Sequence, residues 1–281
     1  MIIDFHTHMF PDSVAAKTMD ALSRSSHSIN HTAGTYDALC ESAAEAGINY
    51  CVNQPVMTSP KQVIKINTSM IVNRERMESE GIYTFGGLHP DFEDYKAEIK
   101  RLADAGIKGI KIHPAYQGPQ LGDIRYKRII AAASEMDMCV LTHGGFDISI
   151  PDHDYAPISD ALEIIDEVRP TKLILAHMGA WGDWDNVEKY LCGANCYFDT
   201  AFSIGNITLR SDADPANSFT KNMDNDQFVR ICRKHGCDKV LFGSDSPWES
   251  QSTYLKWVED CGLNEDELDL ILAENAKALL F

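Results

Sequence analysis

The stretch Ile2-Ile3-Asp4-Phe5-His6-Thr7-His8 joins a short apolar run to a polar end that carries two histidines. The apolar part predicts a buried strand over Ile2–His6. A doubly wound α/β sheet is the main alternative fold for such a chain, and it usually has a glycine-rich phosphate-binding turn after its first strand. His6-Thr7-His8 occupies that place here, so the sequence disfavours a dinucleotide-binding fold.

Similar apolar runs recur along the chain and alternate with stretches of helical periodicity. The predicted strands are Ile2–His6, Tyr50–Asn53, Tyr83–Leu88, Gly109–His113, Cys139–Thr142, Leu173–Ala176, Cys196–Asp199 and Val240–Gly243. The predicted helices are Tyr36–Ala46, Gln62–Ser79, Asp94–Ala105, Arg125–Met136, Ser159–Val168, Trp184–Leu191, Asp226–His235, Thr253–Asp260 and Glu265–Leu280. Strands that alternate with helices pair in parallel, and eight units of about 35 residues fit a (β/α)8 barrel. We therefore expect an α/β protein with one TIM-barrel domain over residues 1–281.

Three stretches carry no clear periodicity and are predicted to be long loops at the rim of the barrel. They are Met9–Thr35, Phe146–Ile158 and Phe202–Asn225. The last is rich in polar residues, and we expect it to form a lid or pocket wall that influences substrate choice.

Composition excludes several classes of partner. The 281 residues include 42 acidic and 25 basic residues, which gives a net charge of −17. Such a surface repels phosphate backbones and anionic lipids, so neither nucleic acid nor a membrane surface is an expected partner. The sequence has no apolar run of membrane-spanning length, and its beginning does not resemble a signal peptide. The eight cysteines form no CxxC pair, which favours reduced thiols in the cytoplasm.

Several predicted strands end in residues that bind metals or carry protons. The intervals between His6, Lys111, His143, His177 and Asp245 are close to whole multiples of the repeat length, so these five residues recur at one phase of the βα unit. Catalytic groups of a TIM barrel lie at the carboxyl ends of its strands, where such residues converge. Imidazoles and a carboxylate that meet at one point predict a divalent metal site. The residues are His6 and His8, His89, Lys111 and His113, His143, His177 and Asp245.

The same segments resemble the amidohydrolase superfamily of metal-dependent barrel enzymes. The matching segments are Asp4-Phe5-His6-Thr7-His8, Leu141-Thr142-His143, Leu175-Ala176-His177, Phe242-Gly243-Ser244-Asp245-Ser246-Pro247 and the ending from Glu274 to Phe281. The short chain, the Gly-Ser-Asp-Ser-Pro-Trp segment and the Asn-Ala ending are most similar to the amidohydrolase-related branch. That branch includes aminocarboxymuconate-semialdehyde decarboxylase and its relatives.

The resemblance implies roles for these residues. Zinc is the expected ion, with manganese, iron and nickel as alternatives, and one ion is favoured over two. His177 would bind a second metal or act as a general acid or base. Lys111 would be a carbamylated bridge between two ions or, with one ion, a cation that holds a substrate carboxylate. The implied metal ligands are His6, His8, His143 and Asp245.

A bound ion would acidify a coordinated water, and Asp245 would carry its proton to the leaving group. We therefore expect a hydrolase that cleaves amide, lactone or ester bonds of a small molecule. A decarboxylase acting on a small carboxylated substrate is the alternative, and a non-catalytic metal-binding barrel is less favoured. A homo-oligomer is left open. The expected substrate contacts are Lys111, His113, His89, Tyr116, Trp181 and Trp248.

Two further roles are predicted. Asp199, at the end of its strand, is expected to orient His177, because metal-binding imidazoles usually donate to a carboxylate or carbonyl. Four other histidines are expected at the surface. They are His27, His31, His153 and His235.

Overall fold

A barrel of parallel strands forms the centre of the molecule. The computed structural model describes the backbone of residues 1–281 and every side chain except that of Asn217. Its strands are β1 (Ile3–Thr7), β2 (Tyr50–Asn53), β3 (Ile82–Thr84), β4 (Gly86–Gly87), β5 (Gly109–Ile112), β6 (Cys139–Thr142), β7 (Leu173–Leu175), β8 (Tyr197–Asp199) and β9 (Val240–Leu241). β3 and β4 are the two halves of the single strand predicted over Tyr83–Leu88, interrupted at Phe85. The eight predicted strands are therefore present.

All neighbouring strands run parallel, in the orders β1-β2-β3 and β4-β5-β6-β7-β8-β9. Backbone bonds join β9 to β1, where Phe5 N donates to Phe242 O at 2.7 Å and Asp245 N donates to His6 O at 2.8 Å. At the other junction Phe85 N donates to Asn53 O at 3.0 Å. These bonds close the barrel, which confirms the predicted (β/α)8 fold.

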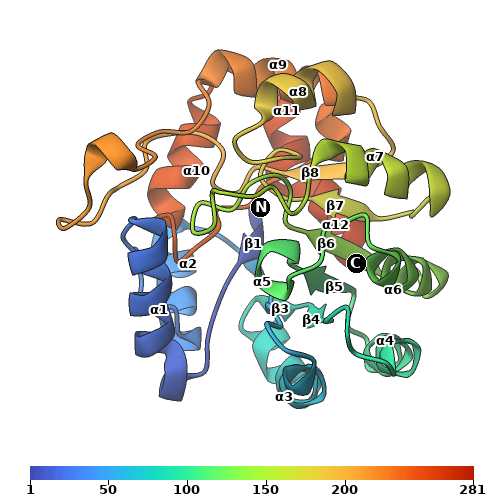
Figure 1. The fold of residues 1–281 in the computed structure, drawn as a ribbon. Coiled ribbons are helices and arrows are strands. Elements are labelled where there is room, and N and C mark those ends of the chain that lie inside the picture. The colour runs from blue at the N-terminus through green and yellow to red at the C-terminus, as the bar shows by residue number, and fades with distance from the viewer.

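Helices surround the barrel as an outer ring (Figure 1). They are α1 (Asp12–Ser26), α2 (Tyr36–Ala46), α3 (Val63–Ser79), α4 (Tyr95–Asp104), α5 (Pro114–Gln117), α6 (Ile124–Glu135), α7 (Ile158–Glu167), α8 (Trp184–Asn186), α9 (Asn225–His235), α10 (Gln251–Glu259), α11 (Glu265–Asp269) and α12 (Asn275–Leu280). Short 3-10 turns lie at Pro60–Gln62, Pro215–Asn217 and Cys237–Lys239, and π-helical turns lie at Val187–Leu191 and Leu270–Glu274. No described helix is both long and apolar enough to cross a membrane.

Alternate strand residues fill the barrel, and a second core lies between the strands and the outer helices. Ala276, Leu279 and Leu280 of α12 pack against the strand residues of the inner core. The last helix therefore covers one end of the barrel, and its apolar residues exclude water from that end. The inner core comprises these three residues with Ile3, Phe5, Val52, Phe85, Cys139, Leu141, Ile174, Ala176 and Leu241.

The prediction of a loop over Met9–Thr35 is wrong, because this stretch contains the 15-residue helix α1. α1 buries only Ala15, Met19, Ser23 and Ser26, and no side chain caps its N-terminus. The sequence therefore has no capping side chain that marks the start of this helix, and two of its four buried positions are serines.

The segment Phe202–Asn225 is largely irregular and lies against the end of α1. Ser28 and Leu209 form an isolated antiparallel bridge, and Ile29 N donates to Thr208 O at 3.0 Å. Arg210 N in turn donates to His27 O at 3.0 Å. This segment therefore holds α1 in place.

Candidate metal centre

The end of β1 is irregular, and this irregularity positions the first two histidines. Ile3 and Phe5 belong to the core inside the barrel, whereas the pairing register with β2 shifts between Asp4 and Thr7. A bulge of this kind redirects the side chains that follow it. Gly243 is required beside it, because a Cβ at this position would lie 2.7 Å from the His6 Cβ.

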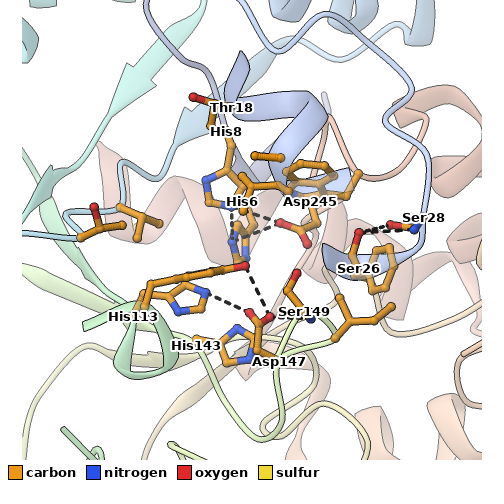
Figure 2. Close-up of a pocket in the computed structure, with 18 of the residues that line it drawn as sticks. His6, His8, Thr18, Ser26, Ser28, His113, His143, Asp147, Ser149 and Asp245 are labelled. Carbon is orange, nitrogen blue, oxygen red and sulfur yellow. Dashed lines mark hydrogen bonds and ion pairs between the residues drawn. The ribbon is translucent and has the colours of Figure 1, made fainter. Parts of the chain in front are cut away.

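Four imidazoles from three strand ends face one another. His6 Nε2 lies 3.2 Å from His8 Nε2, and His177 Nε2 lies 3.1 Å from His143 Nδ1. The rings of His6 and His177 link the two pairs, with centroids 5.4 Å apart. The structure therefore brings together His6, His8, His143 and His177, and Figure 2 labels the first three of them.

The outer nitrogen of each of these rings has a hydrogen-bond acceptor at 2.8–2.9 Å. These acceptors fix the rings as tautomers whose inner nitrogen carries a lone pair directed at the common point. The pairs are His6 Nδ1 with Asp199 Oδ2, His8 Nδ1 with Gln54 O, His143 Nε2 with Phe146 O, and His177 Nδ1 with Ala201 O.

Asp245 completes the group. Its Oδ1 lies 3.2 Å from His8 Nε2 and 3.5 Å from His6 Nε2. Asp245 and His177 both have left-handed backbone conformations, with φ of 67° and 61°. Such conformations are uncommon for residues other than glycine and concentrate at functional sites.

Burial decides the protonation of the histidines. It lowers the pKa of His177 to about 3, with the neighbouring His143 as the next cause, and it lowers the pKa of His6 and His143 as well. Burial opposes ionisation of Asp245, but the facing rings of His8 and His6 outweigh it and hold the pKa of this carboxyl below its usual range. Neutral imidazoles beside a carboxylate form a ligand set suited to a divalent metal.

Lys111 lies at the inner edge of this group. Its Nζ is 3.2 Å from His6 Nε2, and its side chain is fully buried. Burial lowers the pKa of the amine to about 8, against the opposing charges of Asp199 and Asp245. An amine that loses its proton so readily can bind a cation or react with carbon dioxide, as the carbamylation hypothesis requires.

Two predictions about neighbouring residues are wrong in detail. Asp199 orients the ring of His6, whereas it contacts His177 only through the backbone, by accepting from its N–H at 2.9 Å. The prediction that His235 lies at the surface also fails. Its ring is buried and stacks on Phe198 with centroids 3.7 Å apart, because α9 packs over β8.

A cavity of about 510 Å³ opens over the metal centre and is mainly apolar. Among the predicted substrate contacts, His113, Tyr116, Trp181 and Trp248 line it together with Lys111. His89 is not part of its lining; the ring instead accepts from Asp91 N at 3.1 Å through Nδ1.

Helix α1 supplies much of the cavity wall that the sequence assigned to loops. Val14, Thr18 and Leu22 of α1 line the cavity. From the described side chains of Phe202–Asn225, Phe202 contributes. These α1 contacts were missed because the helix itself was missed.

Asp147 is a lining residue that sequence reasoning also missed. It is buried and lies 3.6 Å from His113 Nε2 through Oδ2. His113, His143 and Asp147 form a second group of potential ligands. The rings of His113 and His143 are stacked, however, with planes 25° apart and centroids 4.4 Å apart. Lone pairs in parallel rings do not converge, so this group suits an ion poorly. In the sequence, the one feature that pointed to Asp147 was its position four residues after His143.

The donor set around His6 fits a metal ion. Two lone-pair nitrogens at 3.1–3.2 Å repel each other unless a cation lies between them or one is protonated, and burial disfavours protonation.

Fold and site together define a metal-dependent enzyme of the (β/α)8 class. The chain belongs to the amidohydrolase family, whose model matches residues 3–281.

Solved structures share this fold at low sequence identity. One is a 2,6-dihydroxybenzoate decarboxylase from Rhizobium, with 14% identity and a TM-score of 0.67 over 99% of this chain and 98% of that chain. A dihydroxybenzoic acid decarboxylase from Polaromonas with bound manganese has 13% identity and a TM-score of 0.67, over 99% and 96%. A putative 2-pyrone-4,6-dicarboxylic acid hydrolase from Pseudomonas putida has 15% identity and a TM-score of 0.64, over 99% and 97%. No curated protein matches the chain.

Proposed function

We propose that this protein is a metal-dependent hydrolase that cleaves an ester, lactone or amide bond in a small molecule without a carboxylate. The observation that carries the choice of hydrolysis is the charge of the cavity. Arginine is absent from its described lining, and the two lining lysines are Lys17 and Lys111. Lys17 is exposed on α1, and Lys111 lies against His6. Away from the metal and Lys111, a carboxylated substrate would therefore lack the paired cation that burying its charge requires.

The proposed ligands are the four inner imidazole nitrogens and Asp245. A metal bound there would supply an acidified water and polarise the scissile carbonyl. We favour zinc, because an imidazole-rich set suits it. We also favour one ion per chain, with Lys111 as a free amine. A carbamylated Lys111 between two ions is the alternative.

Asp245 is placed to move the proton. Its carboxylate is held ionised and faces the inner nitrogens of His6 and His8, on the floor of the cavity. It accepts a proton from the attacking water and returns that proton to the leaving group. His177 remains neutral because burial depresses its pKa, so it acts as a ligand or as a hydrogen-bonding group.

One observation favours decarboxylation as a second candidate. Lys111 is a buried amine beside the ligand atoms and would attract a substrate carboxylate if it kept its proton. The similar structures include decarboxylases as well as a putative hydrolase.

The free state of all eight cysteines supports a reducing compartment, and we propose the cytoplasm. A small molecule is the proposed substrate, and self-association into a homo-oligomer stays a hypothesis.

The test uses zinc-loaded protein with phenyl acetate, δ-valerolactone and 4-nitroacetanilide as hydrolytic probes and 2,6-dihydroxybenzoate as the decarboxylation probe. We expect acid release from at least one hydrolytic probe, with loss of turnover in Asp245→Asn. Asp226→Asn is the matched control, because this exposed acid on α9 lies outside the cavity lining. Release of carbon dioxide without any hydrolysis would overturn the proposal in favour of decarboxylation.

A further inference from the structure

A carboxylate faces the cavity beside the metal centre without a cationic partner. The side chain of Asp147 is buried and lines the cavity. Its Oδ1 accepts from Ser149 N at 2.8 Å and from the Tyr116 hydroxyl at 3.4 Å. Among the described residues, Oδ2 has no hydrogen-bond donor, and it lies 3.6 Å from His113 Nε2. One oxygen of Asp147 is thus fixed by hydrogen bonds, whereas the other contacts His113 at 3.6 Å, beyond hydrogen-bond distance, and is open to a ligand (Figure 2).

Aromatic side chains surround the same space. A positive group gains energy over the face of such rings, and the gain rises when water is excluded. Apolar walls also make an unpaired carboxylate costly once a ligand displaces water from the cavity. A ligand with a positively charged nitrogen satisfies both features. The aromatic lining consists of Phe10, Tyr116, Phe146, Trp181, Phe202 and Trp248.

No ion pair in the described part of the protein explains why a charged side chain stands at Asp147. No lysine or arginine forms an ion pair with it among the described residues, whereas Asp199 and Asp4 each anchor groups of the metal centre. The net charge of −17 further raises the concentration of cations around the protein as a whole.

We infer that the substrate carries a protonated amine, bound between Asp147 Oδ2 and the aromatic wall while its carbonyl lies at the metal centre. This inference rests on the proposed function, because it names the substrate class of the same cavity. It also explains a cavity that offers a free carboxylate and no arginine. The ammonium donates to Oδ2, while Tyr116 and Ser149 N keep the other oxygen in place.

The experiment measures binding without turnover. Zinc-loaded protein is titrated with benzylammonium and with benzyl alcohol, which match in shape and differ in charge, and heat or tryptophan fluorescence is recorded. We expect the wild type to bind benzylammonium about tenfold or more tightly than the alcohol, as a charge-assisted hydrogen bond implies. Asp147→Asn should abolish this preference. Asp152→Asn, an exposed acid in the same loop, should keep it.

Equal affinities for the two probes in the wild type, or no saturable binding of benzylammonium, would overturn the inference. So would a preference that persists in Asp147→Asn, since the amine would then be binding the metal. The wild-type comparison needs no variant, so a folding defect in Asp147→Asn leaves it decisive. A protein that selects benzylammonium but hydrolyses no probe would keep this inference and refute the proposed function.

Discussion

Replacing Asp199 by asparagine tests how the metal centre is organised. Asp199 Oδ2 accepts from His6 Nδ1 at 2.8 Å, and Oδ1 accepts from the backbone of His177 at 2.9 Å and of Ala201 at 3.1 Å. An asparagine can keep both backbone bonds with its oxygen. Its amide then faces His6 and can only donate. His6 Nδ1 must accept, and the ring proton moves to Nε2, the nitrogen proposed to bind the metal.

This change of tautomer should weaken the binding of the metal. Loss of a carboxylate that orients a ligand typically lowers metal affinity by about 10- to 100-fold, or ~1.4–2.7 kcal/mol. We expect Asp199→Asn to fall in this range, measured by competition with a chromophoric chelator. The fold should persist, because the backbone bonds survive. Asp226→Asn controls for the loss of one negative charge, and its metal affinity should equal that of the wild type. Unchanged affinity in Asp199→Asn would refute the proposed orientation of His6.

The remaining predictions concern three parts of the chain. Asp245→Asn and His6→Ala should each abolish turnover while the circular dichroism spectrum is retained, because the first removes the proton carrier and the second a ligand. Lys111→Ala should keep one zinc per chain by elemental analysis and lower kcat/KM. His235 should make the protein less stable in acid, because burial lowers its pKa from 6.5 to about 4. The unfolded chain then binds more protons between these values, so this contribution, at most about 3 kcal/mol, is complete above pH 6.5 and is lost as pH falls through 4. Urea unfolding across this range should show a smaller slope with pH in His235→Phe, which keeps a ring against Phe198.

Each of these three predictions could be contradicted by a specific result. Near-normal turnover in either ligand-site variant would remove that residue from the mechanism. Two zinc ions in the parent protein and fewer in Lys111→Ala would support the carbamylated bridge. An identical pH slope in wild type and His235→Phe would mean that other groups set the acid sensitivity.

The sequence alone determined the barrel and the proposed ligands. Strand positions were predictable because a strand buried on both faces must be a continuous apolar run. The convergence of His6, His8, His143, His177 and Asp245 was predictable because residues at the carboxyl ends of barrel strands share one location. These are consequences of local pattern and of repeat length, which need no knowledge of side-chain contacts.

Only the tertiary structure decided how the ligands are held and what surrounds them. The orientation of His6 by Asp199 joins β1 to β8, and the exposure of Asp147 to the cavity depends on the path of the loop after β6. The wall formed by α1 was equally hidden, because no capping side chain marks the start of this helix and serines occupy half of its buried positions. Such features depend on contacts between segments far apart in the chain. Local composition constrains those contacts weakly, so packing alone fixes them.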